Sequence, residues 1–186
     1  PRENKYNHAA QFGIRNGVAR KPVLHADQQS HWEDSTRSSG GQIPEAALIC
    51  NFPGGIAGDP GLMEHNDVET FFHEFGHLLH SLFAGRQPWM GIAGISTEWD
   101  FVEAPSQLLE EWAWDASTLQ TFAKHYQTNV PIPTELVTQM RRADEFGKGL
   151  QVRQQMFYAK LSLSCYDRDP KTVNTDTLAK ELRSRY

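Results

Sequence analysis

The chain has 186 residues, of which 39% are hydrophobic and 22% charged, and its formal net charge is −5. The mean hydropathy is −0.58, and no apolar run approaches the about 18 residues that a membrane helix requires, so a membrane-spanning segment is excluded. The isoelectric point is near 5.9 and the basic residues are scattered along the chain, which argues against nucleic acid as a partner.

The two cysteines, Cys50 and Cys165, lie far apart and form no C-x-x-C pair. Each is flanked by apolar residues, which predicts a buried small side chain rather than a disulfide. The first residues show no basic region followed by an apolar one, so no secretory signal peptide is predicted. We therefore expect a reducing, cytoplasmic environment. Any metal site must use histidine and carboxylate ligands.

Residues 1–60 favour a small sheet. Two β-favouring stretches, residues 5–14 and 17–24, are separated by an Asn-Gly turn signal, and a third apolar run covers residues 45–52. Between them, residues 25–42 are rich in Ser, Gly and Asp and are predicted to form a mobile surface loop.

After residue 60 the composition favours helices. Asn66 and Glu69 have the spacing of an N-cap residue and its N3 partner, so they predict the start of a helix that Gly85 is suited to end. Further helices are expected over residues 97–125, 134–165 and 176–185. The predicted fold class is therefore mostly α with a small antiparallel β-sheet (α+β).

The first of these helices contains the motif H-E-x-x-H, formed by His73, Glu74 and His77. On a helix the two histidines lie about 40° apart and about 6 Å along the axis, so both imidazoles face one point. Two nitrogen ligands at that spacing suit a tetrahedral Zn²⁺. Glu74 lies about 100° round the helix from His73, where it can act on a water as general base rather than serve as a ligand.

The helix is amphipathic around the motif. Polar residues, including Glu69 and His80, share a face with the two histidines, while the aromatic and aliphatic residues lie on the opposite face. An ordinary solvated polar face would show the same pattern. One class of zinc proteases needs a third histidine six residues after the second, but Phe83 occupies that position and excludes the class.

A glutamate on a second helix can complete the site, and Glu98 and Glu103 are the two candidates. They lie about 140° apart if helical, so they cannot both face the metal, and geometry alone leaves both open. Glu98 has another explanation, because a carboxylate near a helix start is stabilised by the helix dipole. Glu103 has none as good. It precedes Pro105, which lacks an N–H and should kink the helix or mark its first turn.

Other residues near the motif are candidates for supporting roles. Glu69 and Glu110 are placed one or two turns from a predicted ligand and can orient a ligand imidazole, although solvated carboxylates would fit as well. His65 is expected in the loop before the helix, with a substrate contact as the alternative. Four aromatic residues are expected to pack the second helix: Trp99, Phe101, Trp112 and Trp114.

Two segments, VETFFHEFGHLLH at 68–80 and EWDFVEAPSQLLEEWAWD at 98–115, carry a resemblance to a known family. With the opening PRENKYNHAAQFG and the run ALICNFP, they resemble the family of zinc metallopeptidases that includes thimet oligopeptidase, oligopeptidase A and peptidyl-dipeptidase, most closely its thimet oligopeptidase-like branch. In the family's pattern the glutamate of D-F-V-E, here Glu103, is the third zinc ligand. The resemblance implies a zincin-like core with a second ligand-bearing helix. Residues 1–186 would then be part of the catalytic domain of a larger helical peptidase, with the sheet in 1–60 and the zinc-binding helices in 61–186.

The resemblance also implies a function, that of a zinc metalloendopeptidase acting on short peptides. One zinc ion per chain would be held by His73, His77 and Glu103, with Glu74 as general base. A peptide could add as a strand along residues 46–52. The family's later segment, whose His and Tyr contact substrate, is not in this sequence, so the alternative is a zinc-binding fragment that is catalytically incompetent by itself.

Overall fold

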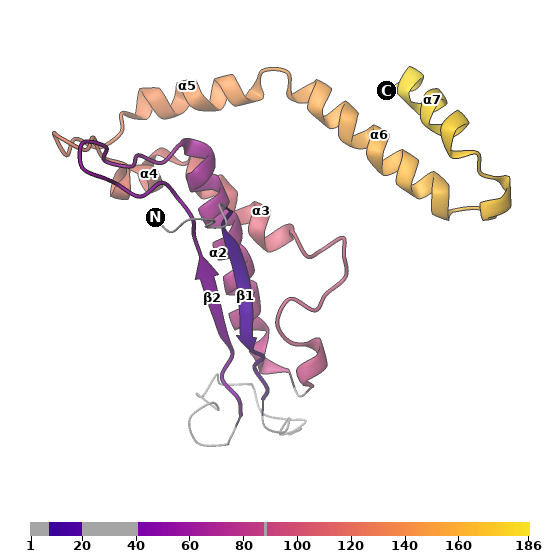
Figure 1. Ribbon diagram of the computed structural model, residues 1–186, viewed down its shortest axis with the longest axis horizontal. Helices are drawn as coiled ribbons and strands as arrows, with labels where there is room; N and C mark the ends of the chain where they lie inside the picture. The colour runs from indigo at the N-terminus through magenta and orange to yellow at the C-terminus, as the bar shows by residue number, and fades with distance from the viewer. Residues whose placement is uncertain (1–7, 20–40, 88) are drawn as a thin grey trace, which may run out of the picture. The chain divides into compact units, whose positions relative to one another are not determined.

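The computed structural model describes residues 8–19, 41–87 and 89–186. The chain forms two compact units, Pro1–Pro133 and Thr134–Tyr186. The described residues are mostly helical and contain a two-stranded antiparallel sheet (Figure 1), so the predicted α+β fold class is confirmed. Within the described part of the chain, no helix is both long and apolar enough to cross a membrane.

The sheet of the first unit consists of β1 (Ala10–Arg15) and β2 (Glu45–Ile49). Ala10 lies opposite Ile49, and the register shifts by one residue between Gly13 and Arg15, which marks a β-bulge. β2 falls inside the predicted run 45–52, and β1 overlaps the predicted stretch 5–14 and ends one residue beyond it. The predicted mobile loop lies almost wholly outside the described residues, as does most of the predicted stretch 17–24.

Helix α2 (His65–Phe83) organises the first unit and contacts β1, β2 and α3 (Ala104–Glu110). Its apolar face is aromatic: the rings of Phe71 and Phe75 stack with centroids 6.0 Å apart, and Phe72 meets Trp112 edge-on at 6.2 Å. These contacts anchor one face of the helix, as the amphipathic pattern predicts, and leave the histidine-bearing face toward α3.

The start of α2 differs from the prediction. Glu64 is the N-cap residue, and its backbone N–H donates to Asp67 at 3.0 Å in a capping box. The pair Asn66 and Glu69 has the right spacing but lies already inside the helix, where the Glu69 carboxylate is engaged by a tryptophan. At the other end, α2 is followed by a 3₁₀ turn, η1 (Ala84–Arg86), which contains the predicted terminating residue Gly85.

The prediction of a single helix over residues 97–125 is wrong. The chain instead forms η2 (Met90–Ile92), a series of turns to residue 103, then α3, η3 (Glu111–Trp114) and α4 (Ala116–Phe122). Pro105 explains the late start of α3, because a residue without an N–H fits the first turn of a helix but not its interior. Asp115 explains the break before α4, since its carboxylate accepts from the Thr118 N–H at 2.7 Å and caps a new helix.

The second unit contains α5 (Thr134–Glu145), α6 (Lys148–Tyr166), the 3₁₀ turn η4 (Pro170–Thr172) and α7 (Thr175–Arg185). The sequence predicts one helix over 134–165, but Gly147 has a φ of +76° and separates α5 from α6. Glycine adopts that backbone conformation without a steric cost from a Cβ, so α5 can stop before Gly147 and α6 can begin after it. The predicted last helix, residues 176–185, is confirmed as α7.

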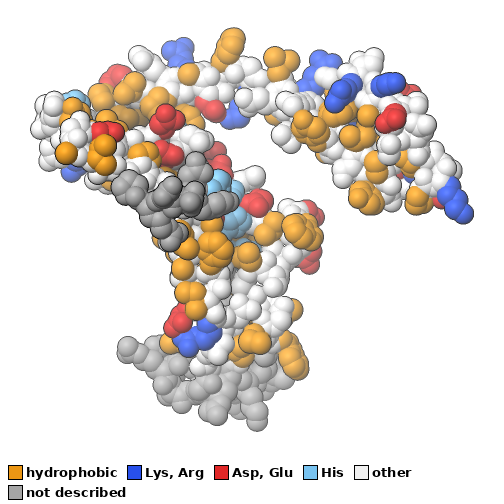
Figure 2. Space-filling view, in the orientation of Figure 1, with side chains coloured by type: hydrophobic (Ala, Val, Ile, Leu, Met, Phe, Trp, Pro, Cys, Tyr) orange, Lys and Arg blue, Asp and Glu red, His pale blue; other side chains and the backbone are white. Residues whose placement is uncertain are grey.

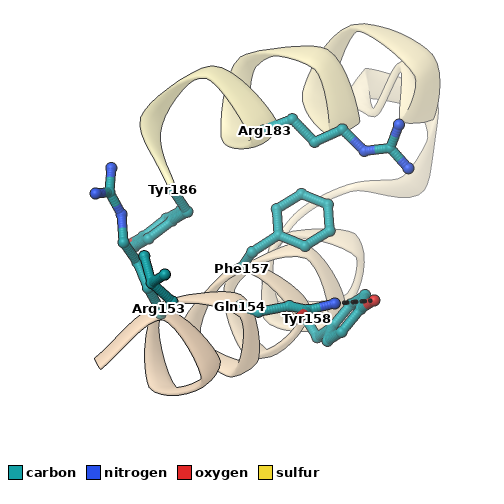
Figure 3. Close-up of a pocket in the computed structure, with 7 residues that line it drawn as sticks. Arg153, Gln154, Phe157, Tyr158, Arg183 and Tyr186 are labelled. Atoms are coloured by element: carbon teal, nitrogen blue, oxygen red, sulfur yellow. Dashed lines mark hydrogen bonds between the residues drawn. The ribbon is translucent and has the colours of Figure 1, made fainter. Parts of the chain in front are cut away.

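Helices α6 and α7 contact each other and enclose a shallow pocket (Figure 3). Phe157 lies at its centre, with the Arg183 guanidinium 6.0 Å from the ring centroid in a cation–π arrangement. Arg153 donates to the Arg185 carbonyl at 3.0 Å and so joins the two helices.

The two cysteines, Cys50 and Cys165, are expected from the sequence to be buried. In the structure both are half-buried, and neither forms a disulfide.

Candidate metal centre

Three of the predicted site residues converge between α2 and α3. His73 and His77 lie one turn apart on α2, and the Nε2 atoms of both face the same oxygen of Glu103, Oε2, at 3.3 and 3.1 Å. Ligand atoms of the three residues lie within 4.8 Å of one another, a spacing that can hold a metal ion. Figure 2 shows a patch of histidine side chains beside acidic ones on the visible face of the first unit.

Glu103 reaches this position as the N-cap residue of α3 rather than from within a helix. Its carbonyl accepts from the Gln107 N–H at 2.9 Å, and the Ser106 hydroxyl donates to its Oε2 at 2.7 Å. The hydrogen bond from Ser106 is the main cause that lowers the pKa of the Glu103 carboxyl, with the two histidines adding to the effect. The carboxylate is therefore held in place and ionised.

The second nitrogen of His73 identifies its tautomer. Nδ1 lies 2.5 Å from Oε1 of Glu110, and because an ionised carboxylate only accepts hydrogen bonds, Nδ1 carries the proton and donates it to Glu110 in this hydrogen bond. In the neutral ring, Nε2 then carries a lone pair that points at the Glu103 carboxylate. Two lone pairs at 3.3 Å repel, so the arrangement needs a proton or a cation between them, and the donor set fits a zinc ion.

His77 and His80, the next two histidines of α2, have different surroundings. The His77 side chain is 12% exposed, and its Nδ1 has no hydrogen-bond partner within the described part of the chain. His80 does not join the group; its ring meets Phe101 edge-on at 6.0 Å. Burial lowers the pKa of His80, and the neighbouring His77 lowers it further, so the neutral form of His80 is favoured.

Glu74, the predicted general base, is held by the sheet. The backbone N–H of Gln11 in β1 donates to Oε2 of Glu74 at 2.8 Å, and the Gln11 side chain donates to Ser81 one helix turn beyond His77. This contact ties the edge of β1 to the motif helix. It orients the carboxylate through one oxygen, which leaves the second oxygen for a water.

Among the supporting residues, the structure separates Glu110 from Glu69. Glu110 orients the His73 imidazole, as one of the two alternatives expected. Glu69 does not: its Oε1 accepts from the Trp114 indole at 2.6 Å. His65 is the first residue of α2 rather than a loop residue, and its ring lies edge-on to Trp114 with centroids 4.3 Å apart.

Glu98, the other candidate for the third ligand, is not part of the group formed by His73, His77 and Glu103. It is exposed in the turns before α3, where the Thr97 hydroxyl donates to its carboxylate at 3.1 Å. Trp99 is 93% exposed, so it does not pack the second helix as expected. Trp99 lies in the turns before α3.

Two residues that sequence reasoning missed bring the helices together, Gly76 and Ser106. A Cβ added to Gly76 would lie 2.5 Å from the Ser106 Cα, and Ser106 itself is completely buried. The available signals were a glycine in mid-helix, which is unfavourable unless close packing requires it, and a serine three residues after the candidate ligand.

Comparisons with known proteins identify the family of the chain. A family model described as peptidase family M3 matches residues 1–186. Saccharolysin of Saccharomyces cerevisiae is 33% identical over 89% of this chain and 21% of its own length. A mitochondrial intermediate peptidase of Arabidopsis thaliana is 33% identical over 100% of the chain and 24% of its own length. Dipeptidyl carboxypeptidase of Escherichia coli is 39% identical over 73% of the chain and 20% of its own length. The chain thus spans about a fifth to a quarter of these relatives.

Proposed function

The chain belongs to peptidase family M3, and from this premise we propose that it carries the zinc-binding catalytic core of a metallopeptidase that cleaves short peptides. The observation that carries the proposal is the convergence of the His73 and His77 Nε2 atoms on one oxygen of Glu103. These three side chains would be the zinc ligands, one ion per chain, and Glu74 would be the general base. Two imidazoles and one carboxylate are a common ligand set of catalytic zinc sites.

A bound zinc ion would act as a Lewis acid that lowers the pKa of water and polarises the scissile carbonyl. The chain's own residues supply the rest. Glu110 holds the His73 ring in the tautomer whose Nε2 is a ligand. Glu74, oriented by the Gln11 N–H, takes the proton from the attacking water and delivers it to the leaving amine.

The substrate would add to the sheet at β2. The outer edge of β1 is used by α2, because the Gln11 N–H donates to Glu74. β2 pairs with β1 along one edge, so a peptide would pair with the other edge of residues 46–52. Backbone hydrogen bonds would then give affinity with little dependence on side chains, which suits an enzyme acting on varied short peptides.

Metal analysis and a peptide assay test the proposal together. Purified protein should contain about one zinc ion per chain, and His73→Ala should lose it. A quenched fluorescent peptide of about ten residues should be cleaved, and Glu74→Gln should abolish cleavage while it keeps the metal. Full zinc content in His73→Ala would contradict the ligand set.

The alternative is metal binding without turnover by these 186 residues. It is supported by the short span of the chain relative to its relatives. The same assay separates the two functions, since zinc bound with no cleavage at any peptide concentration supports the alternative. A cytoplasmic location, expected from the unpaired cysteines, stays a prediction that cell fractionation can test.

A further inference from the structure

We propose that Gly76 and Ser106 are positioning residues that place Glu103 against the two histidines. The inference rests on the proposed function, because it concerns how the third zinc ligand is delivered. Gly76 acts by letting the α3 backbone approach α2. Ser106 acts by holding the Glu103 side chain once α3 is there.

The backbone contact at Gly76 is closer than any side chain would allow. A Cβ at this position would lie 2.5 Å from the Ser106 Cα and 2.6 Å from the Pro105 carbonyl oxygen. Both are backbone atoms of the first turn of α3, so they cannot move aside as a flexible side chain would. Gly76 lies between His73 and His77 in sequence, and the contact is therefore made beside the metal-binding turn of α2.

Ser106 completes the arrangement from the other helix. Its side chain is completely buried, and its hydroxyl lies 2.7 Å from Glu103 Oε2 and 3.0 Å from the Glu103 carbonyl oxygen. The oxygen that it contacts is the same one that faces both histidines. The hydroxyl thus fixes the Glu103 rotamer, which is otherwise about half exposed and free to turn toward solvent.

A methyl group at Gly76 would force α3 away by about 1 Å, the difference between these distances and ordinary van der Waals contact. Glu103 is three residues from the contact and would move with the helix. Because ligand distances at a zinc site vary by only about 0.2 Å, such a shift removes Glu103 from the ligand set.

A double-mutant cycle on zinc affinity tests this inference. The apparent zinc affinity of the full chain is measured by competition with a chromophoric chelator for four proteins: unchanged, Gly76→Ala, Glu103→Ala and the double variant. We expect Gly76→Ala to weaken zinc binding by at least about 10³-fold, as much as Glu103→Ala does, because both remove the same ligand. In the Gly76→Ala background, Glu103→Ala should then cost less than about threefold more, because its contribution is already lost.

Two other glycines supply matched controls. Gly85→Ala crowds Pro44 and Gly17 beyond the end of α2, with a Cβ 2.7 Å from Pro44 Cγ, so it strains the same unit without touching α3. It should leave the full effect of Glu103→Ala. Gly149→Ala lies in α6, where a Cβ meets nothing within 4 Å, and should leave zinc affinity unchanged.

Ser106→Ala gives an independent measurement and is needed if Gly76→Ala does not fold. It removes the hydroxyl without adding an atom, and we expect a loss of zinc affinity of about 10-fold to 100-fold. Unchanged zinc affinity in Ser106→Ala, or additive effects of Gly76→Ala and Glu103→Ala, would overturn the inference. If Glu103→Ala alone has no effect in the otherwise unchanged chain, it is the ligand set of the proposed function that fails.

Discussion

The two units of the chain differ in charge and in how their helices are covered. Residues 1–133 carry eight basic and 16 acidic residues, a net charge of −8, whereas residues 134–186 carry ten basic and seven acidic residues, a net charge of +3. In the first unit α2 is contacted by both strands and by α3. In the second, α6 and α7 contact each other. Large apolar side chains remain at the surface of both units (Figure 2), for example Phe83 of α2, which is 75% exposed, and Tyr166 of α6, which is 86% exposed.

This difference follows from the sequence patterns of the two longest helices. In α2 the aromatic residues share one face and the histidines another, so the sequence pattern predicts which face of the helix packs against the rest of the unit. In α6 apolar residues occur all round the helix: Leu150 is 72% exposed and Leu163 is 56% exposed. A helix of that kind is typical of one covered on several sides. The candidate metal centre lies in the first unit, where α2 packs against β1, β2 and α3, so variants of this unit test its geometry.

The largest expected effect contrasts Glu103 with Glu98. Glu103→Ala should weaken zinc binding by at least about 10³-fold, because it removes one of the three proposed protein ligands. Glu98→Ala should change zinc affinity by less than about threefold, because its carboxylate contacts Thr97 and not the histidines. Competition with a chelator measures both variants. The reverse ranking would move the third ligand to the turns before α3.

Removal of the metal should act on one unit and spare the other. A ligand at 1,000 times its dissociation constant stabilises the folded state by about 4 kcal/mol, so chelation should lower the stability of the first unit by up to that amount. Hydrogen exchange measured with and without chelator should show faster exchange of amides in α2 and α3. Amides of α6 and α7 provide the internal control, and equal acceleration there would mean that the two units do not respond separately.

A smaller effect is expected at Glu110, which touches no metal. Glu110→Ala removes the acceptor for the His73 Nδ1 proton and so releases the ring from its tautomer and orientation. Loss of such a partner costs about 10-fold to 100-fold in metal affinity. The matched control is Trp114→Phe, which removes the hydrogen bond from the indole to Glu69, one helix turn before His73. It should leave zinc affinity within about threefold of that of the unchanged chain. An effect of Trp114→Phe as large as that of Glu110→Ala would mean that both contacts serve the site.

The sequence predicted the parts of the site that depend on a single helix. The spacing of His73 and His77 fixes their convergence, because any α-helix places residues four apart on one face. The position of Glu103 could not be derived in this way. It depends on the approach of two helices, and that approach depends on Gly76 and Ser106, whose role emerges only when both backbones are in place.

The fold follows the same division. The class, the strands of the small sheet and the last helix could be predicted from the sequence, but the boundaries of the helices between residues 97 and 166 could not. Three residues set these boundaries. Pro105 lies in the first turn of α3, Asp115 caps the start of α4, and Gly147 interrupts the helix predicted over 134–165. Each acts through a single backbone position. The first-turn role of Pro105 was one of the expected alternatives, whereas a hydrophobic pattern averaged over a helix does not show the effects of Asp115 and Gly147.

The smallest expected effect tests whether the second unit can be altered without touching the metal site. Gly147 has a φ of +76°, so Gly147→Ala forces a Cβ into a left-handed conformation and should destabilise the α5–α6 junction by about 1–2 kcal/mol. Gly149, two residues later, lies in the first turn of α6, where an added Cβ meets nothing within 4 Å, so Gly149→Ala should stabilise the helix by up to about 0.5 kcal/mol. Hydrogen exchange of α6 amides measures both changes, which should have opposite signs. Zinc affinity should be the same in both variants, and a change in it would show that the two units are energetically coupled.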